Sequence, residues 1–291
     1  MIIFQMKKTL LLLLITFAST SAFAKLNVVV SIQPQLEFVN KIGGDKINTS
    51  LMVLPGNSPH TYEPKPSQMK AISKADLYLS IGVEFENVWL EKFTNQNRNL
   101  IVHNISKDIK RTAMQGHNHK GHHHQTKKMI LDPHIWVNPI KVQQIAHNIA
   151  ESLISLDANN SHYYQANLNN YLKELKQLDL EIRNILKDTP KKTTFMVFHP
   201  AWGYFAQQYG LHQLAIEVEG KTPKPKQLIG IIKEAKEKQV KAIFTQPEFS
   251  DQVAQTISKE LSIQVIKTSP LSKNWSENLK KLAKSIALGS K

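Results

Sequence analysis

"NVVVSIQPQLEFVNKIGGDKINTSLMVL", residues 27–54, contains a complete strand–helix–strand unit. Its two ends, 27–32 and 49–54, are short apolar segments rich in β-branched residues, which indicates strands buried on both faces. Between them, 34–44 begins with a proline and ends with two glycines, which are typical start and stop signals of a helix. A strand, a helix and a second strand in this order predict parallel pairing.

The same alternation recurs on both sides of a long helical region. The expected strands are 27–32, 49–54, 76–81 and 99–105 in the first half, and 193–198, 212–216, 241–245 and 263–267 in the second. Helical segments in the second half are expected around 201–209, 226–238 and 251–261. We therefore predict an α/β fold with two lobes, each a mainly parallel sheet flanked by helices.

The region between the two halves reads as two helices. Pro139 opens the first, and the turn-forming residues 157–161 end it. The second carries an apolar stripe with charged residues on its other faces. The stripe consists of Leu168, Leu172, Leu175, Leu178, Ile182 and Ile185. Because the stripe covers only about three heptads, we interpret it as a rigid linker helix packed across both lobes, and not as a coiled coil.

The first 24 residues have the pattern of a signal peptide. Lys7 and Lys8 precede the apolar run 10–17, and Ala22-Phe23-Ala24 fits a cleavage site. No later segment has the roughly 20 apolar residues of a membrane helix, and no cysteine is present to carry a lipid. We expect an exported, soluble protein without a lipid anchor, held together by its core alone.

These boundaries predict four parts. They are a signal peptide at 1–24, an N-terminal lobe at 25–140, linker helices at 141–189 and a C-terminal lobe at 190–291. The net charge is +14, and it is spread over lysines on helical faces. Since no basic run is interleaved with aromatic residues, nucleic acid is not an expected partner.

Residues 107–129 differ from the rest of the chain. This segment has almost no periodic apolar residues, so we expect a surface loop. Its centre, "GHNHKGHHH", contains five of the twelve histidines: His117, His119, His122, His123 and His124. These side chains could form an auxiliary weak metal site, sense excess metal or meet another metal carrier; they could also be no more than a solvated loop.

Three other histidines are expected immediately after predicted strands, flanked by prolines and aromatic residues. His60 lies in "LPGNSPHTYEP", His134 in "LDPHIWVNP" and His199 in "FHPAWGYF". Open α/β sheets bind ligands at the carboxyl ends of their strands. Three imidazoles completed by a carboxylate or water make a tetrahedral zinc site, whereas manganese and magnesium prefer more oxygen.

The quoted histidine segments, together with "IFTQPEFSDQ" (243–252), resemble the ZnuA-type zinc-binding proteins of metal ABC transporters. The resemblance covers essentially the whole mature chain. It implies a periplasmic protein with one zinc ion between two lobes, delivered to an inner-membrane ABC permease for import. His60, His134 and His199 match the ligand histidines of that family.

The resemblance also bears on the choice of metal. Manganese-type relatives are expected to carry a glutamate at the place of His199 and an aspartate near the C-terminal end. This chain has "KTSPLSKNW" (267–275) in that last region, without an aspartate. We therefore expect zinc, with a manganese- or iron-binding relative on the same scaffold, or an adhesin, as alternatives.

The fourth ligand stays open between water, Glu248 and Glu63, in that order of preference. Asp132 is expected to orient His134 or to cap a turn, and not to bind the metal, because ligating histidines need an outer acceptor. An open fourth position is also the form of a catalytic zinc site. A zinc hydrolase would need a general base near the metal, and the H-E-x-x-H motif is absent. We expect a monomeric binding protein and no enzyme.

Overall fold

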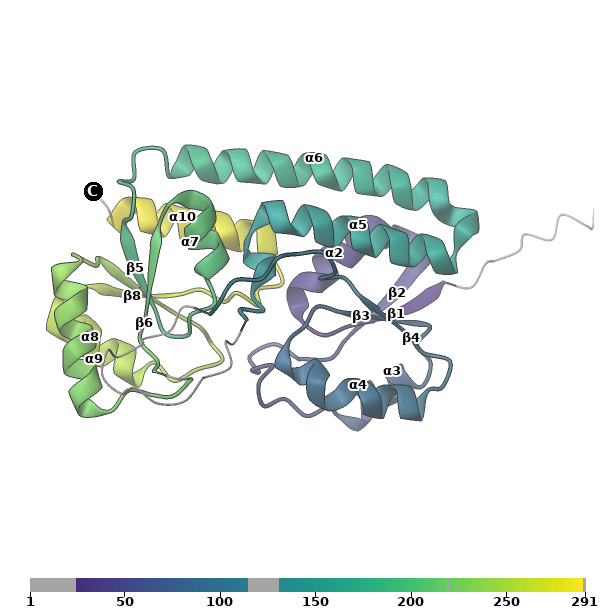
Figure 1. Ribbon diagram of the computed structural model, residues 1–291, viewed down its shortest axis with the longest axis horizontal. Helices are drawn as coiled ribbons and strands as arrows, with labels where there is room; N and C mark the ends of the chain where they lie inside the picture. Colours follow the sequence, from purple (N-terminus) through teal and green to yellow (C-terminus); the bar gives the residue numbers. More distant parts are fainter. Residues whose placement is uncertain (1–24, 115–130, 219, 290–291) are drawn as a thin grey trace, which may run out of the picture.

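Eight short strands form two separate, fully parallel sheets, which lie in two lobes of the molecule (Figure 1). The computed structural model describes residues 25–114, 131–218 and 220–289. The expected signal peptide and the histidine-rich run 116–124 lie outside the described residues. In both lobes, apolar strands alternate with helices as expected.

The N-terminal sheet has the order β2-β1-β3-β4. Its strands are β1 (Leu26–Val30), β2 (Ile47–Leu51), β3 (Leu77–Ser80) and β4 (Ile101–Asn104). The helices of this lobe are α2 (Gln33–Gly43), α3 (Pro66–Ile72) and α4 (Glu84–Gln96), with a short 3-10 turn, η1 (Gly44–Lys46), before β2. Val28 of β1 pairs with Thr49 on one side and with Leu77 on the other. The chain thus changes direction between β1 and β3, and this switch creates a crevice at their carboxyl ends.

The C-terminal sheet repeats this arrangement in the order β6-β5-β7-β8. Its strands are β5 (Thr194–Val197), β6 (His212–Ala215), β7 (Ala242–Thr245) and β8 (Gln264–Lys267). The helices are α7 (Gly203–Tyr209), α8 (Pro225–Glu237) and α9 (Gln252–Leu261). All eight predicted strands are present, with small shifts at their ends, and the predicted α/β class is confirmed.

Three long helices join the lobes. They are α5 (Pro139–Leu156), α6 (Ser161–Ile185) and α10 (Trp275–Gly289), with the short turns η2 (Ile135–Val137) before α5 and η3 (Ala158–Asn160) between α5 and α6. Asn138 caps α5, because its side chain accepts hydrogen bonds from the backbone of Ile140 and Lys141. Figure 1 shows α6 running along the top of both lobes, with α5 and α10 beneath it.

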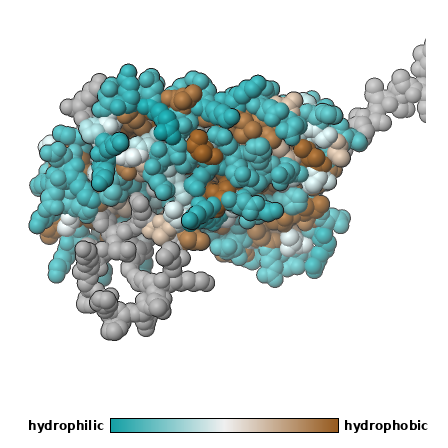
Figure 2. All heavy atoms as spheres, turned by 45° about the horizontal axis from the view of Figure 1, so that its top comes forward, coloured by the Kyte–Doolittle hydropathy of each residue, from teal (hydrophilic) through white to brown (hydrophobic). Residues whose placement is uncertain are grey.

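The predicted stripe of α6 faces inward. Leu168, Leu175, Leu178 and Ile182 are buried, and Tyr164 and Tyr171 extend the same face. The opposite face is largely hydrophilic, with a few apolar patches (Figure 2). Within the described part of the chain, no helix is both long and apolar enough to cross a bilayer, α6 included.

One apolar core runs through both lobes. It joins the N-terminal sheet and α2 to α5, α6 and α10, and continues to Phe195 of β5 and Phe244 of β7. A second, smaller cluster fills the space between the other face of the C-terminal sheet and α8 and α9. Because a continuous core opposes relative movement of the parts it joins, we infer that the interface between the lobes is stiff.

The buried stripe of α6 gives a stability prediction. We expect Leu175→Ala to lower the free energy of unfolding by about 2–5 kcal/mol, because its side chain is 1% exposed and truncation leaves a cavity. Leu180→Ala on the same helix is the matched control, since Leu180 is 60% exposed, and we expect a change within about 0.5 kcal/mol. Chemical denaturation measures both; equal effects would show that α6 does not pack as described.

Candidate metal centre

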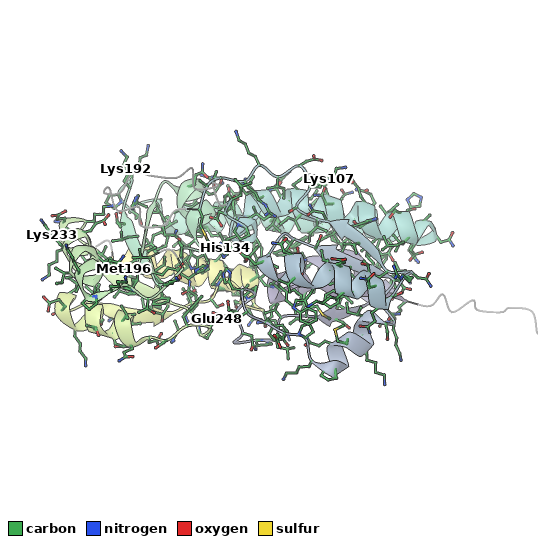
Figure 3. All side chains as sticks on the ribbon, turned by 60° about the horizontal axis from the view of Figure 1, so that its bottom comes forward. Lys107, His134, Lys192, Met196, Lys233 and Glu248 are labelled. Atoms are coloured by element: carbon green, nitrogen blue, oxygen red, sulfur yellow. The ribbon has the colours of Figure 1, made fainter. Side chains whose placement is uncertain are left out.

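The fold brings the three predicted histidines together between the lobes. The ring centroids of His60 and His199 lie 5.3 Å apart, and those of His134 and His199 lie 5.2 Å apart. Figure 3 shows His134 at the junction of the two lobes, with Glu248 nearby. The three side chains come from three loops far apart in the sequence. Only His199 follows its strand closely; the expectation of a strand directly before His134 is wrong for the described residues, because that histidine lies in the loop before α5.

The rings are close, but they are not yet in a coordinating arrangement. Among residues 25–114, 131–218 and 220–289, no group of three or more His, Asp and Glu side chains has its donor atoms in position to hold a metal ion. Zinc would need each nitrogen at about 2.0–2.1 Å. His60 is the most exposed of the three and has the most freedom to rotate.

His199 is placed by the first C-terminal strand. It follows β5 closely, at the carboxyl end of the sheet where the strand order reverses. Its Nδ1 lies 2.9 Å from Oε1 of Glu217, which is buried. Since a carboxylate only accepts, Nδ1 must carry the proton, which leaves Nε2 with a free lone pair. Nε2 is buried and has no hydrogen-bond partner among the described residues.

Two further side chains hold His199 in place. The amide of Gln246, just after β7, donates to the His199 carbonyl at 3.1 Å. The ring of Phe249 stacks on the imidazole, with centroids 5.3 Å apart and planes at 25°. His199 is thus fixed on its backbone, its Nδ1 and one ring face, while its Nε2 is left to bind a ligand.

His134 is held by Asp132 in the loop before α5. One carboxylate oxygen of Asp132 accepts from the His134 backbone at 2.9 Å and lies 2.8 Å from its Nδ1. The Tyr204 hydroxyl donates to the Asp132 carbonyl at 2.9 Å. Gly203 permits this approach of α7, because a Cβ there would lie 3.1 Å from the Asp132 carboxylate. Asp132 therefore orients the His134 ring, in the role expected of it.

His60 lies at the edge of the site, on the loop between β2 and α3. Its side chain is 35% exposed, and its Nδ1 lies 3.4 Å from a carboxylate oxygen of Glu84 at the start of α4. Partial burial is the main cause that lowers the pKa of His60, and the charge of Glu84 opposes this effect. The lowered pKa favours the neutral imidazole, which is the form that binds a metal.

The three histidines line a cavity of about 20 Å³. Other wall residues are Glu84, Trp136, Gln246, Glu248, Phe249 and Leu271. This volume accepts one water molecule or one ion.

The structure separates the two candidate carboxylate ligands. Glu248 is in the cavity wall, where its Oε1 accepts from the Ser269 hydroxyl at 2.8 Å and burial raises its pKa. Glu63 is exposed and is not among the residues of the wall. The sequence interpretation overlooked Glu84 and Glu217. Glu217 carried a signal, since it is an acidic residue directly after the apolar strand "HQLAI".

Comparison with known proteins establishes the family. Residues 28–288 match the model of the family described as "ZnuA: Zinc-uptake complex component A periplasmic". The chain belongs to the ZnuA family. Among curated relatives, it is 32% identical to the high-affinity zinc uptake system protein ZnuA of Bacillus subtilis over 244 residues, which cover 81% of this chain and 76% of that protein.

Other ZnuA-like relatives differ in length or in named metal. The zinc-binding protein AdcA of Streptococcus pyogenes is 28% identical over 86% of this chain, which spans about half (51%) of the length of AdcA. A manganese ABC transporter substrate-binding lipoprotein of Streptococcus gordonii is 29% identical, with 85% of this chain and 80% of that protein covered.

Solved structures agree with the family assignment. A structure described as "Crystal structure of ZnuA" is 39% identical with a TM-score of 0.84, and the match covers 92% of this chain and all (100%) of that one. A zinc-bound ZnuA with residues 138–173 deleted is 40% identical with a TM-score of 0.83, over 91% and 98% of the two chains. The predicted family and two-lobed fold are confirmed.

The carboxylate contacts predict the tautomers of two histidines. We expect His134 and His199 to carry their proton on Nδ1 in the metal-free protein at about pH 8, above the ordinary histidine pKa. Long-range proton–nitrogen NMR correlations distinguish the tautomers, and the exposed His147 of α5 gives the solvent reference. A proton on Nε2 of His199 would contradict the proposed orientation of its lone pair.

Proposed function

We propose that this protein captures zinc in the periplasm and delivers it to the inner-membrane permease of an ABC importer. The observation that carries the proposal is the buried Nε2 of His199, which lacks a partner among the described residues and belongs to a ring within 5.3 Å of two other imidazole rings. Membership of the ZnuA family supports the same conclusion.

Zinc is held, in this proposal, by His60, His134 and His199. Each of these histidines has a carboxylate near its Nδ1: Glu84, Asp132 and Glu217, respectively. Such carboxylates fix the ring and make its other nitrogen a stronger ligand. A set of three neutral nitrogens favours zinc over manganese, which prefers oxygen. The manganese- or iron-binding alternative therefore has less support from the side chains of the site.

Water completes the zinc site in the proposed complex. Glu248 already uses Oε1 to accept from Ser269, and its raised pKa reflects a cost of keeping its charge in the cavity wall. Water needs only the small space that the cavity provides. Glu248 remains the second choice, and the exposed Glu63 has no support from its position.

The remaining features extend the proposal. The signal-peptide pattern of residues 1–24 supports export to the periplasm. In this proposal the histidine-rich run 116–124 provides an auxiliary, weaker zinc site that exchanges zinc with a second periplasmic zinc carrier. The protein acts as a monomer in this scheme, since the proposed ligands all belong to one chain.

A competition titration tests the zinc site. We expect His199→Ala to weaken zinc binding by more than the roughly 100-fold typical of losing an outer partner, because a direct ligand is removed. His147→Ala, on the exposed face of α5, is the control and should bind like the wild type. The stripped protein, with and without 116–124, is titrated against a chromophoric zinc chelator with manganese as challenger. If tight zinc binding is lost when residues 116–124 are removed, or if manganese displaces zinc, the proposal is refuted.

A second variant tests the fourth ligand. With water in that position, Glu248→Gln should change zinc affinity by less than about 10-fold, the lower bound for an outer-shell partner. Ser269→Ala, which frees the Glu248 carboxylate from its hydrogen bond, serves as the matched comparison. A loss for Glu248→Gln as large as that of His199→Ala would instead identify Glu248 as a direct ligand.

A further inference from the structure

Two buried tryptophans are linked through the backbone beside the proposed zinc site. The indole N–H of Trp136 donates to the Pro270 carbonyl at 2.8 Å, and the indole N–H of Trp275 donates to the Trp136 carbonyl, also at 2.8 Å. Each tryptophan is only 1% exposed. We call Trp136, Pro270 and Trp275 the tryptophan latch. It connects the loop before α5 to the segment between β8 and α10.

The latch touches the metal site directly. Trp136 lies two residues after His134, and the centroids of their rings are 5.1 Å apart. Trp136, Pro270 and Leu271 also line the same cavity as the three histidines. A shift of the Trp136 backbone would therefore move His134 relative to His199.

The far end of the latch is anchored in the N-terminal lobe. The ring of Trp275 packs edge-on against Phe38 of α2, with centroids 5.0 Å apart. The carboxylate of Glu37 accepts from the Trp275 backbone at 3.2 Å and from the Ser276 hydroxyl at 2.6 Å. A carboxylate at the first turn of α10 is favoured by the helix dipole. The start of α10, a helix at the C-terminal end of the chain, is thereby fixed to α2.

This geometry matters because metal coordination tolerates little displacement. Ligands must be held within roughly 0.5 Å of the productive position. His134 is held by Asp132 and directly precedes the 3-10 turn Ile135–Val137, which contains Trp136. The carbonyl of Trp136 is inside the core, and without the Trp275 N–H it would lose its buried donor. That loss would favour rearrangement of the loop.

We infer that Trp275 is a positioning residue for the zinc site. Trp275 acts on His134 through Trp136, and it thereby couples zinc affinity to the contact between the lobes. This inference rests on the proposed three-histidine site. It adds a determinant about 140 residues away in sequence from the ligand that it positions.

The test compares two tryptophan substitutions in the full mature chain. Trp275→Phe keeps an aromatic ring beside Phe38 but removes the N–H donor, and we expect about a 10-fold loss of zinc affinity, as for outer partners of zinc ligands. Trp89→Phe on α4 is the control, because Trp89 packs with Phe85 and Phe93 away from the cavity wall. We expect its zinc affinity to be unchanged.

A second variant and a second measurement distinguish a positioning role of Trp275 from a purely structural one. Glu37→Gln weakens the same anchor without altering the core, and we expect a smaller loss of zinc affinity in the same direction. Because coupling is reciprocal, zinc should also slow hydrogen exchange of the Trp275 indole N–H, measured by NMR on the wild type.

The outcomes separate this inference from the proposed function. If Trp275→Phe lowers the melting temperature but leaves zinc affinity unchanged, or if zinc leaves Trp275 exchange unaltered, the latch is only structural and the inference is overturned. If His199→Ala in the same titration binds zinc like the wild type, the three-histidine site itself is wrong. Loss of zinc affinity in both Trp275→Phe and Glu37→Gln, together with slower exchange of the Trp275 indole N–H when zinc binds to the wild type, supports the inference.

Discussion

The continuous apolar core between the lobes is the constraint on which the site depends. His134 lies on the chain that leads into α5, whereas His199 lies on the loop that follows β5 of the C-terminal sheet. Their rings can stay 5.2 Å apart only if the lobes do not move freely. The inner faces of α5, α6 and α10 provide this stiffness, since they pack into one cluster with both sheets.

Within this frame, each imidazole is oriented by a carboxylate. The contacts of His134 with Asp132 and of His199 with Glu217 are short and buried, whereas that of His60 with Glu84 is longer and more exposed. Two nitrogens are thus held in advance, and the third belongs to a side chain with freedom to rotate.

Much of this arrangement could be predicted from the sequence, because its signals are local. Apolar strand segments, Pro139 at a helix start and the stripe of α6 each depend on neighbours within a few residues. The positions of the three histidines after expected strands marked them as candidate ligands, and the resemblance to a known family matched them to its ligand histidines. Partners such as Glu217 could not be assigned in this way, because an acidic residue after a strand has the same local pattern whether it faces solvent or a histidine.

The sequence by itself therefore determined the two α/β halves, the connecting helices and the histidines available for a metal. Only the tertiary structure decided that Glu84 faces His60 and Glu217 faces His199, that Glu248 and not Glu63 reaches the cavity, and that Trp275 contacts Trp136. The physical reason is the separation in sequence over which each kind of interaction acts. Secondary structure follows from hydrophobic periodicity over a few turns, whereas these contacts join residues from 18 to 139 positions apart, which only packing of the lobes brings together.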